Sequence, residues 1–361
     1  MEEKERIADA ISNIYNDYIA ILNYVTTCLN NKLDYSSFMG VYPFLCLYVV
    51  EGYNFLTKYK IIDTNAISKN NLKKLINCRA CGVKLYSDFK NTTFESINKF
   101  NRNEYEKFFR KAFPNLKLKL LKIVDNYFIC FTDGFPIGNY HLYSKKVLNM
   151  EIGSYIEDVG PRIFELSSVL SSFSFAIVKG INPNVDINQL GKKKININFD
   201  YADLNMAYNY SNFSIKNNPP ILMALLDVLC VLNSCAKIFS LVNDDLRLGV
   251  KIKYPILLYS ILSLKNILKY SEENGIVTGF DKSFETYVND LDARYVKNNL
   301  RKYCMHYEFP KNNWERDPFV EEFSKFFGND FDGVHKEISS TIEELSNKLH
   351  KNLIIKRFSH R

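Results

Sequence analysis

The feature that most constrains the fold is a 22-residue apolar run, ILMALLDVLCVLNSCAKIFSLV, at 221–242. Its length approaches that of a membrane-spanning helix. However, Asp227, Asn233 and Lys237 lie in its interior, and charged side chains are costly in the centre of a lipid bilayer. We therefore expect a buried helix in the core of a soluble protein, with no membrane association.

Most of the remaining chain repeats apolar residues at spacings of three and four, the period of an amphipathic helix. The C-terminal 145 residues or so predict a bundle of four or five helices with short loops and antiparallel neighbours. Prolines and glycines mark several predicted starts and ends, such as Pro161 and Gly180. The helices predicted outside the 221–242 run cover about 5–30, 41–56, 67–77, 103–124, 161–180, 253–272, 282–306 and 333–356.

The middle of the chain predicts small β elements. DNYFICFTDGF contains a strand-like run that ends in the turn dipeptide Asp133-Gly134, and NYHLYS is a candidate partner strand. Further on, KKKININFDY alternates apolar and polar residues with the period of a half-buried strand. The fold class is therefore mainly α, a helical bundle with a few small β elements. We predict a mostly helical N-terminal region, 1–215, and a helical bundle, 216–361.

Composition narrows the choice of function only slightly. The chain has 47 Lys and Arg against 40 Asp and Glu, a net charge of +7, which permits a polyanionic partner without requiring one. The acidic N-terminus, MEEKERIADAI, lacks the pattern of a secretory signal, and the eight cysteines follow no disulfide framework. We expect a cytoplasmic protein with reduced thiols.

Two further patterns each leave two interpretations open. Cys78 and Cys81 form a CxxC, but a structural zinc needs four ligands and no second pair is close in sequence, which favours packed thiols. The basic run Lys192–Lys194 is either a phosphate contact or a solvated loop. Phosphate-loop, dinucleotide and HExxH zinc-protease motifs do not occur in the sequence. We predict neither a metal nor a cofactor.

The remaining candidate site lies in the predicted helix 282–306. Asp290, Arg294, Asn298 and Arg301 follow one another at spacings of four, four and three, and so form a polar stripe. A solvated face with an Asp290–Arg294 ion pair is the simpler explanation. In a straight helix His306 lies about 140° around the axis from Arg301, so the two side chains converge only if the last turn distorts or a second protomer contributes. This geometry predicts a homodimer.

The segment LRKYCMHYEF resembles the Arg-x4-6-His signature of the HEPN superfamily, helical-bundle ribonucleases of toxin, antiphage and RNA-processing systems. The resemblance covers at most residues 217–356. It implies metal-independent RNA cleavage in which a 2′-hydroxyl attacks its own phosphodiester, with Arg301 and His306 as catalytic residues and Arg294, Asn298 and Lys302 binding the substrate. Histidine titrates near neutral pH, and arginine binds phosphate oxygens in a bidentate manner. Lys302 departs from the family pattern, which often has Asn, Asp or His after the arginine.

The resulting expectation is an endoribonuclease of a toxin or antiphage defence system, with RNA as substrate and an antitoxin or regulatory protein as a further partner. Two alternatives remain open. The first is a non-catalytic helical module that binds RNA, a nucleotide or a protein partner, and whose RNA affinity falls steeply with salt if RNA is the ligand. The second is a structural dimerisation domain, in which substitutions of Arg301 and His306 are silent.

Overall fold

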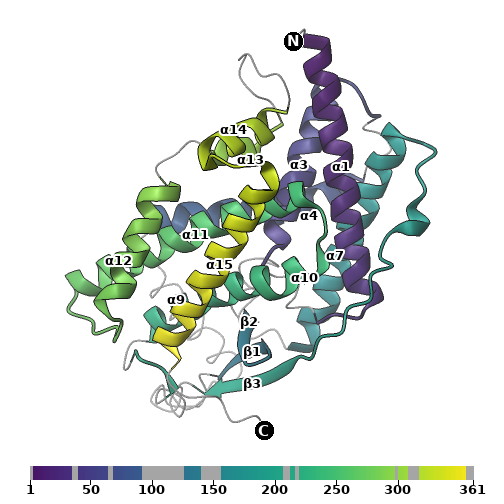
Figure 1. Cartoon of the computed structure of the whole chain (residues 1–361). Helices are drawn as coiled ribbons and strands as arrows, with labels where there is room; N and C mark the ends of the chain where they lie inside the picture. The colour runs from purple at the N-terminus through teal and green to yellow at the C-terminus, as the bar shows by residue number, and fades with distance from the viewer. Residues whose placement is uncertain are drawn as a thin grey trace.

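The computed structural model describes residues 3–34, 40–63, 68–91, 126–139, 156–205, 212–215, 219–296, 300–307 and 317–354. Within these ranges the chain is mainly α, with one small antiparallel sheet formed mid-chain, which confirms the predicted fold class. Figure 1 shows the sheet at one end of the molecule, with long helices crossing above it.

The described α-helices occur in two series along the chain. The first is α1 (Glu3–Asn30), α3 (Tyr42–Lys58), α4 (Lys69–Asn91) and α7 (Ile156–Ile181). The second is α9 (Pro219–Asn233), α10 (Ser240–Val242), α11 (Leu246–Glu273), α12 (Lys282–Leu291), α13 (Arg301–Met305), α14 (Pro318–Phe327) and α15 (Phe331–Leu353). The predicted helices at 5–30 and 333–356 are confirmed to within a few residues at their described ends, whereas α11 begins at Leu246 instead of 253. The helix predicted at 103–124 lies outside the described residues.

The 221–242 run is helical throughout and buried, as its composition predicts. It consists of α9, a π-helical segment at Ser234–Phe239, and α10. Within the described ranges, two helices, at Pro161–Ile181 and Ile221–Val242, are long and apolar enough to cross a membrane, and 89% of the apolar stretch of the second is buried inside the protein. Its interior polar residues have partners: Asn233 donates to the carbonyl oxygen of Pro136 at 2.9 Å. Cytoplasmic location stays a prediction.

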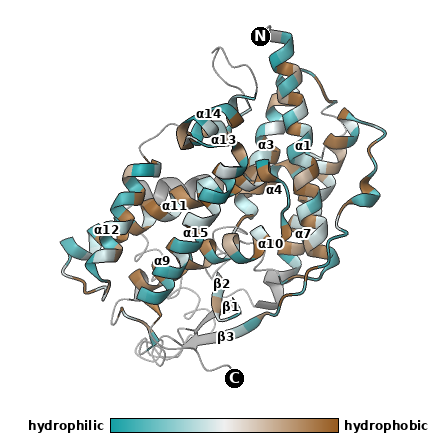
Figure 2. Cartoon of the chain, viewed as in Figure 1, coloured by the Kyte–Doolittle hydropathy of each residue, from teal (hydrophilic) through white to brown (hydrophobic). Residues whose placement is uncertain are grey.

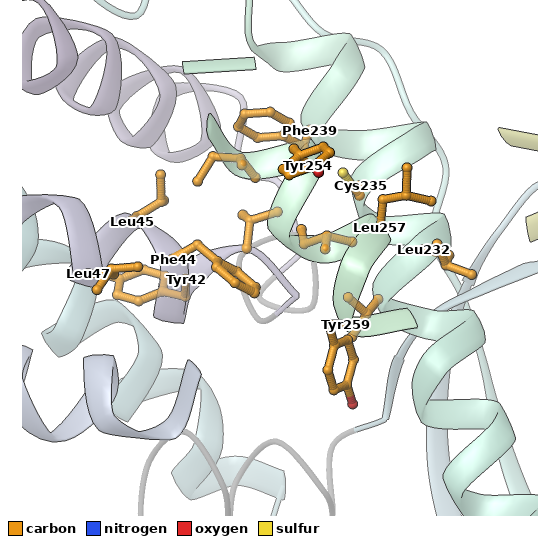
Figure 3. Packing of buried hydrophobic residues seen from close by; sticks show 14 of the residues in the cluster. Tyr42, Phe44, Leu45, Leu47, Leu232, Cys235, Phe239, Tyr254, Leu257 and Tyr259 are labelled. Carbon is orange, nitrogen blue, oxygen red and sulfur yellow. The ribbon is translucent and has the colours of Figure 1, made fainter. Parts of the chain in front are cut away.

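The core joins the two series of helices. Figure 3 shows side chains of α3, among them Tyr42 and Leu45, on one side of the interior and residues of the 221–242 run and α11 on the other. Apolar residues in Figure 2 lie mainly where helices face one another. One cluster of buried residues extends from Ala10 to Leu353 and therefore crosses the proposed boundary at 215/216. The two-region division stays a prediction, but the described helices on both sides share this core.

The sheet has the strand order β2-β1-β3, with β1 (Asn126–Thr132), β2 (Phe135–Asn139) and β3 (Asp200–Asn205). Asp133 and Gly134, with φ of 49° and 80°, form the predicted two-residue turn, a conformation that favours glycine and aspartate. The described partner of β1 across this turn is Phe135–Asn139, which begins before the proposed partner NYHLYS; of that segment only Asn139 is described, opposite Ile129, and the rest lies outside the described residues. A two-residue turn brings the residues directly after it back onto the strand.

The KKKININFDY segment is only in part the predicted strand. Residues 195 to 200 alternate between half-buried and exposed, as expected, but β3 begins at Asp200. The residues before it attach to the chain just after α1, because Asn31, the residue that follows this helix, donates to the carbonyl oxygen of Lys193 and accepts from the backbone N–H of Ile195, both at 2.8 Å. The Asn31 side-chain amide thus provides hydrogen bonds that a neighbouring strand would otherwise provide here.

Several predicted helix boundaries are wrong. Helix α4 continues to Asn91, beyond the predicted end at 77. Helix α7 begins at Ile156, so Pro161 lies inside it and does not start it. The predicted helix 282–306 is also interrupted: α12 ends at Leu291, a π-helical segment follows at Asp292–Val296, and α13 begins only at Arg301. At the start of the π-helical segment the buried Asp292 pairs with Lys265 of α11. The spacing of apolar residues along the chain does not predict this contact between two helices.

Candidate functional site

His306 ends α13 in an extended backbone conformation, with φ of −132° and ψ of 157°. Tyr303, Cys304 and Met305 before it are buried, and so is Tyr307 after it. The His306 side chain is 55% exposed, and its Nδ1 lies 3.3 Å from Oε2 of Glu51 on α3. The histidine is therefore held at one ring nitrogen, while most of its side chain faces solvent.

The Glu51 carboxylate joins His306 to a cation from a third element. Its other oxygen, Oε1, accepts a hydrogen bond from Arg79 of α4, and its side chain is only 14% exposed. A carboxylate that accepts from Nδ1–H selects the tautomer in which Nε2 is free to take a proton. The contact is long for a hydrogen bond. Contacts thus run from Arg79 of α4 through Glu51 of α3 to His306 at the end of α13.

Arg301, the second predicted catalytic residue, is half-buried at the first position of α13. Its positive charge favours the thiolate of Cys304, although burial has the larger effect and raises the pKa of that thiol. The break in the predicted helix changes the geometry on which the polar stripe was based. Arg301 does not end a long straight helix; it opens a short one that His306 closes.

Of the three predicted substrate-binding residues, the structure describes Arg294 and Lys302. Arg294 lies in the π-helical segment and forms an ion pair with Glu337 of α15, so the proposed Asp290–Arg294 pair is wrong. Lys302 is exposed, with its ammonium 4.8 Å from the ring centre of Tyr303. Asn298 lies outside the described residues. Because a π-helical segment has a different periodicity from an α-helix, the four-residue spacing no longer aligns Arg294 with Arg301.

Sequence reasoning missed Glu51 and Arg79. Glu51 is 255 positions from His306, and it occurs in a helix whose other residues are mostly buried and apolar. A single glutamate in such a helix is a weak signal, because a buried carboxylate requires a partner that the local sequence does not supply. Only the packing of α3 against α4 and α13 identifies the partners.

A buried charged network lies directly behind the site. Asp17 of α1 and Lys251 of α11 are each 1% exposed and form an ion pair. Tyr307 donates its hydroxyl to Oδ2 of Asp17 at 2.6 Å, and the Lys251 ammonium lies 4.2 Å from the centre of the Tyr307 ring. Arg247, one turn before Lys251, has its Nε 3.4 Å from Oδ1 of Asp17. This network connects both series of helices to the residue next to His306.

The network also reaches the start of α14. Arg247 forms an ion pair with Asp317, the residue that caps α14, and its guanidinium lies 4.9 Å from the ring centre of Phe319. Burial lowers the pKa of Lys251 from 10.5 to about 8, and the Asp17 carboxylate opposes this shift. Burying these charged side chains is therefore unfavourable, and the ion pairs within the network offset this desolvation cost.

The other sequence motifs contribute little to a site. Cys78 is buried, and burial raises the pKa of its thiol; the side chain of Cys81 lies outside the described part. Among the described residues no group of three or more His, Cys, Asp or Glu is placed to hold a metal ion. In the basic run, Lys193 pairs with Asp244 and Lys192 hydrogen bonds to Gln189, so these two lysines already have partners.

No family model, curated protein or solved structure matches the chain. The His306 site is therefore characterised by its own residues: an exposed imidazole, the Glu51 carboxylate that contacts it, and Arg79 paired with the same carboxylate.

Proposed function

We propose that the protein is a metal-independent endoribonuclease of HEPN type, with His306 as the proton-transferring residue and Arg301 as the phosphate-binding residue. The observation that carries the proposal is the Glu51–His306 pair, in which the carboxylate contacts Nδ1 and the side chain is otherwise largely exposed. A general base must reach its substrate and hold the correct tautomer, and this arrangement supplies both.

The reaction follows from the side chains. Nε2 of His306 accepts the proton of a ribose 2′-hydroxyl while the 2′-oxygen attacks the adjacent phosphorus. The P–O5′ bond breaks, the leaving oxygen takes a proton from an imidazolium, and the products carry a 2′,3′-cyclic phosphate and a 5′-hydroxyl. Arg301 stabilises the negative charge on the phosphorane, because guanidinium stays charged and binds phosphate oxygens at two points. No metal takes part in these steps.

Arg79 is an additional candidate for binding the RNA backbone. It pairs with Glu51, the carboxylate that contacts the imidazole, and its side chain is 31% exposed. Arg294 is likewise paired with a glutamate, but with Glu337 of α15. The homodimer, the cytoplasmic location and the antitoxin or regulatory partner belong to the same proposal. In such a dimer, the protonated His306 of the second protomer would donate the proton that the leaving 5′-oxygen takes.

The test is cleavage of a mixed RNA pool in EDTA by the wild type and by His306→Ala, Arg301→Ala and Glu51→Gln. We expect His306→Ala and Arg301→Ala to lower the rate by about 100-fold or more. Glu51→Gln keeps the volume but removes the charge, so we expect a smaller loss. Arg162→Ala is the matched control for Arg301, because Arg162 is an exposed arginine on α7.

The ends of the products decide between outcomes. Cyclic phosphate ends made by the wild type and the Arg162 variant, but not by the His306 variant, would support the proposal. If His306→Ala and Arg301→Ala cleaved RNA as fast as the wild type, the assignment of these two residues would be wrong. Salt-dependent RNA binding without any cleavage would instead support the non-catalytic module.

A further inference from the structure

The position of His306 depends on contacts that the imidazole itself does not make. Its side chain is 55% exposed, and the contact with Glu51, at 3.3 Å, is near the outer limit for a hydrogen bond. A backbone shift of about 1 Å would therefore break it. The residue must be held in place by its neighbours.

Tyr307 is the neighbour best placed to do so. In the extended conformation of His306, successive side chains point to opposite sides of the chain. The imidazole thus faces solvent and Glu51, while the Tyr307 side chain enters the interior and is 6% exposed. There its hydroxyl donates to Asp17 at 2.6 Å, and its ring lies 4.2 Å from the Lys251 ammonium.

The same buried network fixes the chain at a second point. Asp17 also contacts Arg247, and Arg247 pairs with Asp317 at the start of α14. Tyr307 and Asp317 are the described residues on either side of the 308–316 stretch. A single charged cluster therefore holds both ends of the stretch that follows His306, and one of its members, Asp17, belongs to α1.

We infer that Tyr307, held by Asp17 and Lys251, is a positioning residue that sets the imidazole of His306 against Glu51, and that α1 is thereby part of the site. The expected effect on RNA cleavage rests on the proposed function. The expected orientation and tautomer of His306 do not depend on that function. A merely structural role for Tyr307 would affect stability and leave that tautomer unchanged.

The experiment is nitrogen-15 NMR of the full chain with labelled histidines, at a pH where imidazoles are neutral, for the wild type and Tyr307→Phe. The chain has five histidines, and a His306→Gln sample identifies the signal. Tyr254→Phe is the matched control, because Tyr254 is an equally buried tyrosine that donates to a backbone carbonyl, that of Tyr295, at 3.0 Å. RNA cleavage is measured on the same samples.

We expect His306 to be largely the Nδ1–H tautomer in the wild type and in Tyr254→Phe, and to shift toward the Nε2–H form in Tyr307→Phe. We expect the cleavage rate of Tyr307→Phe to fall by about 10- to 100-fold with little change in KM, as for a misplaced catalytic group. A folded Tyr307→Phe with the wild-type tautomer would overturn the inference, even if RNA cleavage by His306 were established.

Failure of the proposed function has a different signature. If the wild type cleaves no RNA but the tautomer shifts in Tyr307→Phe, the positioning role holds and the nuclease assignment fails. Should Tyr307→Phe not fold, Lys251→Met provides the same readout, because it removes the ammonium beneath the ring and leaves Asp17 with Arg247 and Tyr307. An unchanged tautomer in folded Lys251→Met would then overturn the inference.

Discussion

Replacement of Asp17 by asparagine tests the buried network most directly. Asn keeps the volume and can still accept the Tyr307 hydroxyl, but it removes the carboxylate that faces Lys251, and both residues are 1% exposed. Breaking one side of a buried ion pair costs about 3–5 kcal/mol, because the remaining charge is left uncompensated. Domains of this kind unfold with about 5–15 kcal/mol in total, so the variant should lose a large share of its stability.

The loss should depend on pH in a direction fixed by Lys251. The pKa of Lys251 is about 8 in the folded protein, against an ordinary value of 10.5. Between these two pH values the unfolded chain binds more protons than the folded protein. The free energy of unfolding therefore rises with pH over this interval, by about 3 kcal/mol in all. Without Asp17 the folded pKa of Lys251 falls further, and this rise begins at a lower pH. The gap between wild type and Asp17→Asn should therefore be largest in acid and narrow as the pH approaches 8.

The assay is urea unfolding followed by circular dichroism at about pH 6, 7 and 9. Glu273→Gln is the control, because Glu273 forms an exposed pair with Lys269 at 3.8 Å and exposed pairs contribute at most about 1 kcal/mol. If Asp17→Asn lowered the free energy of unfolding by less than about 1 kcal/mol at pH 6, the Asp17–Lys251 pair would not be a buried ion pair. If the difference in stability between the variant and the wild type stayed constant up to pH 9, Lys251 would not be the source of the pH dependence.

Two further predictions concern the attachment of the basic segment to α1 and the thiols. Gly191→Ala should destabilise by about 1–3 kcal/mol, because Gly191 has φ of +70° and an added Cβ would lie 2.5 Å from Cγ2 of Thr26. Gly275→Ala is the control, because φ is +64° there and nothing lies within 4 Å of the added Cβ, so this variant has the backbone strain alone. If both variants lost the same free energy of unfolding in urea, the close approach of Gly191 to Thr26 would be contradicted. Burial raises the pKa of Cys28 and Cys235 to about 12, so both should resist a thiol reagent at pH 8 until the protein is unfolded. Rapid labelling of either in the native protein, mapped by mass spectrometry, would contradict their burial.

The long helices could be predicted because their signal is local. The apolar stripe Val334, Ile338, Ile342, Leu345 and Leu349 defines α15 by its spacing alone, and all five residues are buried. The Asp133-Gly134 dipeptide likewise predicted its turn, because few residues adopt positive φ at low cost. In both places the residues that cause the helix or the turn lie within a short stretch of sequence.

The break before Arg301 could not be predicted in this way. Phe284, Val288, Leu291 and Tyr295 continue the helical spacing across it, and all four are buried. However, the chain becomes π-helical at Asp292, a buried carboxylate that pairs with Lys265 of another helix. Tertiary contacts override local periodicity where a buried charge needs its partner.

The mainly α fold class and the buried helix at 221–242 could thus be predicted from the amino-acid sequence, because their signals are local. The surroundings of His306 follow only from the packing of the helices. Glu51 and Asp17 lie more than 200 positions away and contact His306 and Tyr307 respectively, and Arg79 contacts Glu51. The physical reason is that a buried charge is stable only beside its counter-charge, and the sequence does not specify which distant residue provides it.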